Sequence, residues 1–116
     1  MESLKTITKA NVKVFLNVQH SLLREQTQLL NQKFGCKWEI YPIPMDGWTK
    51  TEMDKVIWEL GGKTVVFASP VPYILKELAG QNPEGTYIFH NDNRTKKESK
   101  DGTVRYTIAE TGWKLL

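Results

Sequence analysis

Strand-like and helix-like segments alternate along this chain, and this alternation constrains its fold more than any other feature. The strand-like segments are short apolar runs rich in β-branched and aromatic residues, and the helical ones repeat apolar residues every three or four positions. The expected strands are residues 12–18, 38–41, 63–68 and 86–89, and the expected helices are residues 22–34, 49–60 and 71–78. Because strands joined through helices pair by right-handed crossovers, a mostly parallel sheet is predicted.

Local signals support the predicted boundaries. Residues 12–18 form a nearly continuous apolar run, as in a strand covered on both faces. Thr49 and Glu52 have the spacing of a capping box, and Pro72 suits an early helix position. We expect the Pro42-Ile43-Pro44 segment to end the second strand, because proline cannot continue a ladder. The pattern predicts an α/β fold: a small Rossmann-like (flavodoxin-like) three-layer domain.

The C-terminal part has a different pattern. Residues 103–108 alternate polar and apolar side chains after an Asp101-Gly102 turn signal, which predicts a hairpin and an antiparallel edge strand. Residues 111–116 form either a short terminal strand or a docked tail. Residues 1–11 are a polar lead-in, and residues 90–116 are the hairpin extension. Together, residues 1–116 are predicted to form a single Rossmann-like domain.

Composition narrows the classes of function. The chain has 40% hydrophobic residues, enough for a core, and no apolar run approaches the roughly 18 residues that a membrane span needs. Its first residues lack the apolar region of a signal peptide. The single Cys36 excludes a disulfide framework and a multi-cysteine zinc site, and we expect a structural role for it. These features predict a cytoplasmic protein without a membrane partner.

The charge pattern argues against a duplex DNA partner. The formal net charge is +3, which permits an anionic ligand without requiring one. A short basic cluster, interrupted by Glu98, contains Arg94, Lys96, Lys97 and Lys100. This cluster is either a solvated hairpin tip or part of an anion-binding surface, and it is not the dense basic stripe of a duplex DNA binder.

Polar residues gather where this topology places a ligand site. For the strand order 2-1-3-4, the crevice lies between the carboxyl ends of the first and third strands. The predicted rim residues are Gln19, His20 and Ser21 after the first strand, Ser69 after the third, and Asn91, Asn93 and Arg94 after the fourth. This convergence predicts a binding site at that edge of the sheet.

Each of these residues also has a structural interpretation. Ser21 and Ser69 suit helix N-caps, although helix starts also present N–H groups to phosphate. His20 fits a polar loop position as well as a catalytic one, and His90 is either a structural histidine or part of the site. Residues 91–93 fit a simple turn. Trp48 is either a core residue or a stacking platform for a base.

Several chemistries lack their motifs. The chain has neither a glycine-rich dinucleotide fingerprint nor a P-loop, which disfavours ordinary NAD and NTP binding. It has no Gly-x-Ser-x-Gly elbow for a hydrolase triad. Two histidines do not make a metal site, and the closeness of Asp92 to His90 is only weak evidence for a metal ligand. We therefore expect no metal and no cofactor.

The start of the domain resembles a known family. In residues 15–26, FLNVQHSLLREQ, an Asn-x-x-His step formed by Asn17 and His20 precedes a leucine and a Glu-Gln pair that opens the first helix. This segment resembles small CRISPR-associated Rossmann-like proteins, namely the compact ring nucleases and their CARF-domain relatives. In topology the resemblance extends over residues 12–80.

The resemblance implies a function. Such proteins form homodimers that bind cyclic oligoadenylate, the messenger of type III CRISPR defence, across their two-fold axis. They cleave it without metal through attack of a ribose 2′-hydroxyl on the neighbouring phosphate. By position, His20 would be the acid or base, with Ser21 and Ser69 as phosphate donors. Arg94 or Lys96 would suit the developing negative charge.

Three other functions remain open at this point. The first is a sponge or sensor that sequesters a nucleotide signal without cleaving it. The second is a single-stranded nucleic-acid module that uses Trp48 and the basic hairpin for stacking and phosphate contacts. The third is an interaction subunit whose hairpin pairs with a strand of a partner.

Overall fold

The computed structural model describes residues 11–93, 95–98, 104–107 and 109–116. In chain order the elements are β1 (Val12–Asn17), α1 (Arg24–Phe34), β2 (Trp38–Ile43), α2 (Lys50–Leu60), β3 (Thr64–Phe67), α3 (Pro72–Gln81), the 3₁₀ turn η2 (Pro83–Gly85), β4 (Thr86–Asn91), β5 (Thr95–Glu98), β6 (Val104–Thr107) and β7 (Trp113–Leu115). Except for Asn11, the predicted lead-in lies outside the described residues.

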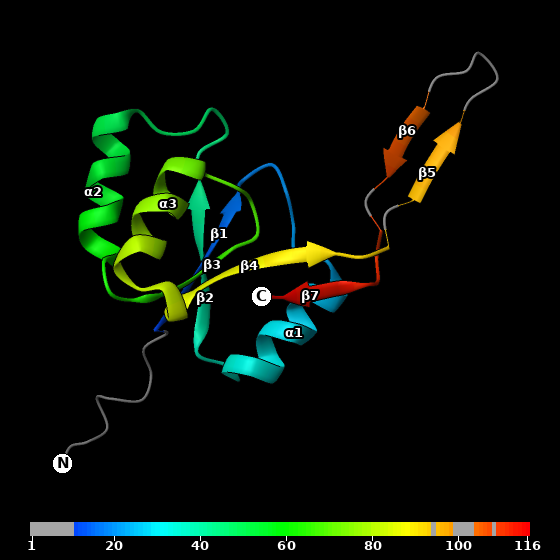
Figure 1. Ribbon diagram of the computed structural model, residues 1–116, viewed down its shortest axis with the longest axis horizontal. Coiled ribbons are helices and arrows are strands. Elements are labelled where there is room, and N and C mark those ends of the chain that lie inside the picture. Colours follow the sequence, from blue (N-terminus) through cyan, green and yellow to red (C-terminus); the bar gives the residue numbers. More distant parts are fainter. Residues whose placement is uncertain (1–10, 94, 99–103, 108) are drawn as a thin grey trace.

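A five-stranded sheet with the order β2-β1-β3-β4-β7 forms the centre of the domain (Figure 1). The first four strands are parallel, and β7 runs antiparallel to β4. Val14 of β1 lies between Ile40 of β2 and Val66 of β3 in the register. The predicted α/β class, the mostly parallel sheet and the order of the first four strands are confirmed.

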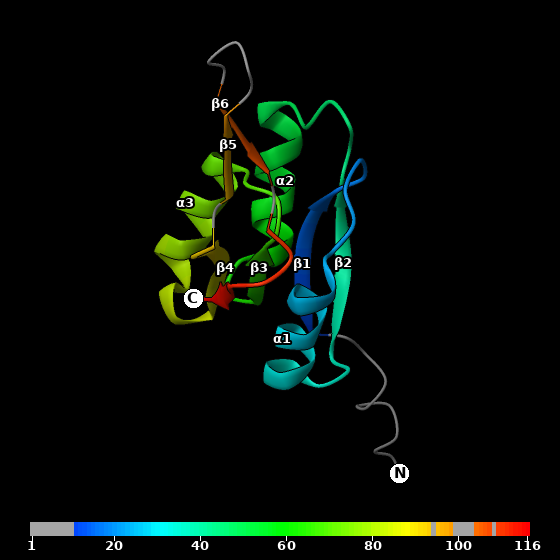
Figure 2. The same cartoon turned by 90° about the vertical axis from the view of Figure 1, so that its right-hand side faces the viewer.

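The helices cover both faces of the sheet, because side chains alternate along the buried strands. On one face, Val14 and Val66 pack with Leu30 of α1. On the other, Phe15 and Phe67 pack with side chains of α2 and α3, which lie side by side (Figure 2). The predicted three-layer architecture is therefore present.

The local signals for α2 and α3 are confirmed. Thr49 is the N-cap of α2, and its hydroxyl accepts a hydrogen bond from the N–H of Glu52. The Glu52 carboxylate in turn accepts from the N–H of Thr49 at 2.8 Å, which completes the capping box. Pro72 is the first residue of α3, where its missing N–H has no helical partner to lose.

β2 ends before Pro44, within the predicted segment, but Pro42 itself does not stop it, so the predicted end at residue 41 is wrong. The strand continues to Ile43, whose carbonyl accepts a hydrogen bond from the N–H of Val18. β2 is the edge strand of the sheet, and the backbone N–H and C=O groups of successive residues point to opposite sides of a strand. The nitrogen of Pro42 therefore faces away from β1, where no hydrogen bond of the ladder is lost.

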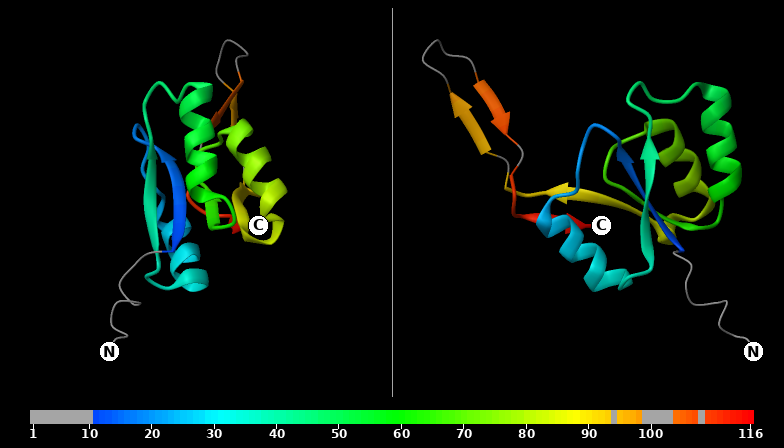
Figure 3. Two further views of the ribbon diagram at one scale, coloured as in Figure 1. Left: turned by 90° about the vertical axis from the view of Figure 1, so that its left-hand side faces the viewer. Right: turned by 180° about the vertical axis from the view of Figure 1, so that it is seen from behind.

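The predicted C-terminal antiparallel hairpin is present, but its strand β6 is not the edge of the main sheet; the short terminal strand offered for residues 111–116 is confirmed as β7 and forms that edge. The sheet ends in β7, whereas β6 pairs with β5 in a separate two-stranded sheet that projects from the domain (Figure 3). Trp113 and Phe89 meet edge to face, and Leu115 packs against the core on the α1 side. β7 therefore has an apolar face to bury at the sheet edge. The predicted Asp101-Gly102 turn lies outside the described residues.

Two further boundaries shift outward. The helix α3 extends to Gln81 and the strand β4 extends to Asn91, so His90 and Asn91 are strand residues. Within the described residues, no helix combines the length and apolar character required to cross a membrane.

Phe15 organises the larger core cluster, and its removal tests the packing. Its ring is fully buried, stacks on Phe67 with 4.5 Å between centroids, and also contacts Tyr41 and Trp48. We expect Phe15→Ala to lower the free energy of unfolding by about 3 to 5 kcal/mol, because it removes contacts and leaves a cavity. Urea denaturation measures this loss.

The matched control is Trp58→Ala. Trp58 is 87% exposed on α2, so its loss is expected to change the free energy of unfolding by less than about 0.5 kcal/mol. Equal losses in the two variants would contradict the described core.

Candidate functional site

A cavity of about 380 Å³ lies at the carboxyl ends of β1 and β3. Its volume is within the range of roughly 300 to 1,000 Å³ that is common for small-molecule sites. The lining residues are Leu16, Asn17, His20, Ser21, Leu23, Gln26, Ala68, Ser69, Pro70 and Trp113. They come from the ends of both strands, the start of α1 and β7. The cavity therefore occupies the edge where the strand order predicts a crevice.

Three of the predicted site residues meet in this cavity: His20, Ser21 and Ser69. Gln19 is exposed and does not line it. Arg94 lies outside the described residues. The backbone of Lys96 lies on β5 in the projecting hairpin.

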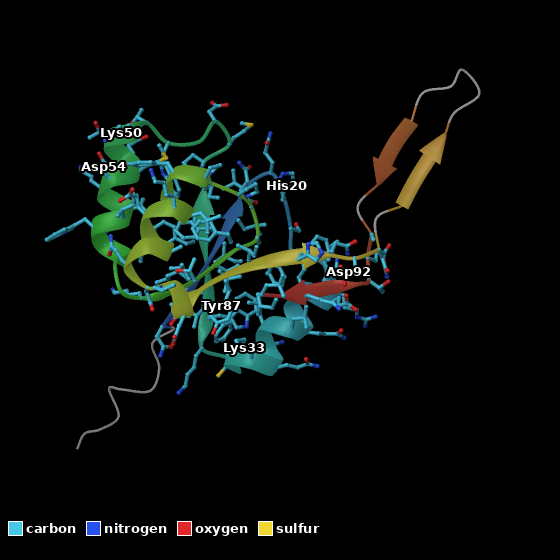
Figure 4. All side chains as sticks on the ribbon, in the orientation of Figure 1. His20, Lys33, Lys50, Asp54, Tyr87 and Asp92 are labelled. Atoms are coloured by element: carbon cyan, nitrogen blue, oxygen red, sulfur yellow. The ribbon has the colours of Figure 1, made fainter. Side chains whose placement is uncertain are left out.

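Asn17 shapes the loop that presents His20. Its side-chain oxygen accepts a hydrogen bond from the N–H of Gln19 at 2.9 Å, and its carbonyl accepts from the N–H of His20 at 2.9 Å. These bonds turn the chain sharply after β1, which is a common use of asparagine. The turn places the exposed His20 at the end of β1 (Figure 4).

Ser69 is buried at the end of β3 and is not a helix N-cap. Its Oγ accepts a hydrogen bond from the N–H of Asn17 at 2.9 Å, and its own N–H donates to the carbonyl of Phe15 at 3.0 Å. The N-cap of α3 is Val71. Ser69 therefore extends the β1–β3 pairing by one side-chain bond, so its expected capping role is wrong.

Ser21 is not the N-cap of α1 either. The helix begins at Arg24 with Leu23 as its N-cap, and the Oε1 of Gln26 accepts the N–H of Leu23 at 2.8 Å. Since Gln26 satisfies that N–H, the chain reaches the helix without a serine cap. Ser21 is left exposed, with its side chain at the cavity.

Of the described residues that line the cavity, His20 is the only one with an ionisable side chain. It is exposed to solvent, whereas Gln26 and Ser69 are buried, with exposed fractions of 6% and 8%. The cavity thus has one group able to exchange a proton at its accessible side and neutral polar groups at its buried side.

Trp48 lies outside the cavity. Its ring contacts Phe15 and Tyr41 with centroid distances of 6.2 and 6.1 Å, and it packs against the core on the α2–α3 face. This position agrees with the core interpretation of Trp48.

Asn91 and Asn93 stabilise the turn after β4. The side-chain oxygen of Asn91 accepts from the N–H of Asn93, and its Nδ2 donates to the carbonyl of Thr111, both at 2.9 Å. Neither asparagine lines the cavity. Their contacts agree with the turn interpretation of residues 91–93.

His90 belongs to a small exposed ion cluster. Its Nε2 lies 2.8 Å from Oδ1 of Asp92, and Lys114 contacts Oδ2 of the same carboxylate at 3.1 Å. Alternation along β4 puts His90 on the opposite sheet face from Phe89, which packs on the α1 side with the cavity. Hydrogen bonds from Lys114 and then His90 lower the pKa of Asp92 below its ordinary value.

No group of three His, Cys, Asp or Glu side chains able to hold a metal occurs in the part of the chain that the structure describes. The single Cys36 is exposed and follows the end of α1. That place is at the amino end of β2, opposite the edge that holds the cavity.

Several residues that line the cavity were not predicted from the sequence. Asn17 and Gln26 lie within the segment that carries the family resemblance, so their position next to His20 was a usable signal. Trp113 had no such signal, because β7 brings it to the cavity from the end of the chain. Its N–H donates to Oε1 of Glu25 at 2.6 Å, which joins β7 to the start of α1.

Known proteins provide no counterpart for this chain. No protein-family model matches it, and neither a curated protein nor a solved structure does so. The resemblance of residues 15–26 to ring nucleases therefore stays a prediction. Function has to be inferred from the cavity and its residues.

Ser69 and Ser21 provide a matched pair of substitutions. Ser69→Ala leaves the N–H of Asn17 without its acceptor, and we expect a loss of about 1 to 3 kcal/mol in the free energy of unfolding. Ser21→Ala removes no cap and is expected to change it by less than about 0.5 kcal/mol. Urea denaturation measures both values. A larger loss for Ser21→Ala would mean that Ser21 caps α1.

The Asp92 cluster predicts a pH effect on stability. Because the pKa of Asp92 is lower in the folded chain than in the unfolded chain, its contribution is present above about pH 3.9, the unfolded value, and is lost as pH falls through the folded value. Asp92→Asn should remove this part of the acid dependence, measured by urea denaturation between neutral and acidic pH.

Asp46→Asn is the control for this pH effect. Among the described residues its carboxylate has no hydrogen-bond or ion-pair partner, so the substitution should leave the acid dependence unchanged. Identical profiles for wild type and Asp92→Asn would contradict the described cluster.

Proposed function

We propose that the cavity binds cyclic oligoadenylate between two copies of the chain, and that His20 promotes its metal-independent cleavage. One observation carries the proposal: among the residues that the structure describes, the cavity at the ends of β1 and β3 is lined by neutral polar groups and a single ionisable one, His20, at its exposed side. The neutral bases of a nucleotide ligand suit the buried polar groups, and its phosphates suit the exposed side with His20.

The reaction needs few protein groups. The 2′-oxygen of a ribose attacks the adjacent phosphorus, the bond from phosphorus to the 5′-oxygen breaks, and a 2′,3′-cyclic phosphate forms. One proton leaves the 2′-hydroxyl and one joins the departing 5′-oxygen. An imidazole can accept the first proton or donate the second, so His20 suits either transfer. Alignment of nucleophile and phosphate within one ligand supplies much of the rate.

The entrance of the cavity suits negative charge. Ser21 has an exposed side chain beside His20, and its hydroxyl can donate a hydrogen bond to a phosphate oxygen. Leu23, the N-cap of α1, also lines the cavity, so the positive end of the helix dipole is close by. These groups would take the role first expected of Arg94 and Lys96.

A second copy of the chain would complete the site. A cavity of about 380 Å³ accommodates part of a cyclic oligonucleotide, and the remainder of the ring needs another protein surface. Val18 and Met45, on the loops after β1 and β2, are 59% and 58% exposed. Apolar side chains beside the site favour an interface there, and two-fold symmetry would bring together two copies of His20.

Sequestration without cleavage is the second candidate. It is favoured because the described lining residues include only one ionisable side chain, and binding needs no proton transfer whereas cleavage does. The single-stranded nucleic-acid function gains less support, because Trp48 packs against Phe15 and Tyr41.

Incubation with cyclic tetra-adenylate in EDTA tests the proposal. We expect linear products ending in a 2′,3′-cyclic phosphate, resolved by chromatography, and a rate loss of about 10²- to 10⁴-fold in His20→Ala. His90→Ala is the matched control, because the other histidine lies on the opposite sheet face from the cavity and should leave the rate unchanged.

The other outcomes separate the candidates. Tight binding of intact cyclic tetra-adenylate, without products, would replace cleavage by sequestration. Absence of both binding and cleavage would contradict both candidates. Light scattering of the liganded protein should give the mass of a dimer, and a monomer would contradict the shared crevice.

A further inference from the structure

We infer that the buried side of the cavity is an adenine subsite in which Gln26 reads the base edge and Trp113 provides a stacking surface. This inference rests on the proposed function for the identity of the larger ligand and deepens it by naming the residues that select the base. It assigns the inner wall to the base and leaves the phosphates to His20 and Ser21.

Gln26 is a buried amide that uses only one of its hydrogen-bonding positions among the described residues. Its exposed fraction is 6%, and its Oε1 accepts the N–H of Leu23 at 2.8 Å. Because Leu23 supplies a donor, the oxygen and not the nitrogen must face it. The Nε2 then has no acceptor among the residues that the structure describes, although Gln26 lines the cavity. A buried donor without an acceptor costs free energy, which a ligand acceptor would recover.

Ser69 provides a second neutral polar group beside it. Its Oγ accepts the N–H of Asn17, which leaves the hydroxyl hydrogen available to a ligand. The side chain is 8% exposed and lines the same cavity. Two buried groups able to donate thus converge on one space.

Trp113 adds an aromatic wall that is held in place. Its Nε1 donates to the carbonyl of Ala109 at 2.8 Å, and its ring meets Phe89 edge to face at 6.2 Å. Since the only polar atom of the indole is already bonded, Trp113 offers the cavity an apolar aromatic surface. Stacking on such a surface is a general way to bind a nucleobase.

The inner wall favours a base over a phosphate. None of the lining residues in the described part of the chain is a lysine, an arginine, an aspartate or a glutamate. A buried phosphate would meet only neutral donors there, at a high cost of desolvation. A neutral planar ring with acceptor atoms meets no such cost, and its attached sugar and phosphate then lie toward the exposed His20 and Ser21.

The geometry of an amide selects adenine among the bases. A glutamine can donate from Nε2 to N7 of adenine and accept from the N6 amino group through its oxygen. The Oε1 of Gln26 uses one lone pair for Leu23 and retains the second. Guanine has a carbonyl oxygen where adenine has its amino group, so it would place two acceptors against each other.

Adenosine and guanosine are the probes, with affinity measured by isothermal titration calorimetry at pH 8. We expect wild type to bind adenosine about 5- to 150-fold more tightly than guanosine, the range for one bidentate amide–base pair. In Gln26→Glu a carboxylate oxygen still accepts the N–H of Leu23, as glutamate does in a capping box, but the donor is lost. We expect that variant to lose the preference for adenosine, and circular dichroism checks that it stays folded, since a buried carboxylate has a desolvation cost.

Trp113→Leu tests the stacking surface, and Trp58→Leu is its matched control. We expect adenosine affinity to fall at least tenfold in the first variant, since stacking on an aromatic ring contributes strongly per base. Trp58 is 87% exposed on α2, so its replacement should leave the affinity unchanged.

The outcomes separate this inference from the proposed function. Absence of adenosine binding, equal affinity for the two nucleosides, or an unchanged preference in a folded Gln26→Glu would each overturn the subsite. Cleavage of cyclic tetra-adenylate in those cases would leave the proposed function intact. Selective adenosine binding without any binding of cyclic tetra-adenylate would support the subsite and contradict the proposed function.

Discussion

The simultaneous pairing of β1 with β2 and β3 is the interaction on which the rest of the structure depends. It buries β1 between two parallel neighbours and stacks Phe15 on Phe67 within the larger core cluster. Because α1 packs on one face of the sheet and α2 and α3 on the other, the chain leaves β1 and β3 in different directions. A space between their ends follows from that divergence, and the cavity occupies it.

The polar groups around this space serve the fold and leave capacity for a ligand. Asn17 turns the chain toward His20, and Ser69 joins the ends of β1 and β3. Gln26 accepts a hydrogen bond from the N–H of Leu23 at the start of α1. Each bond uses only part of what the side chain can donate or accept. The same residues that hold this sheet edge together can therefore also bind a small molecule. A substitution at one of them is expected to change both the stability of the edge and the binding of the ligand.

Much of the fold could be predicted because its signals are local. The capping box at Thr49 and the early-helix Pro72 act within one helical turn, and both are confirmed. The cavity lies at the sheet edge where the strand order predicted a crevice, and His20 and Ser69 line it. Pro42 was misjudged, because its effect on a strand depends on whether that strand is an edge, which is a property of the whole sheet.

By itself, the sequence determined the α/β class, the order of the elements and the edge at which polar residues gather, since periodicity and capping depend on neighbours along the chain. Only the tertiary structure decided which side chains line the cavity. The pairing of β4 with β7 brings Trp113 next to Glu25, and the start of α1 orients Gln26 through Leu23. These contacts depend on how distant segments pack, and packing is not encoded in any one local pattern.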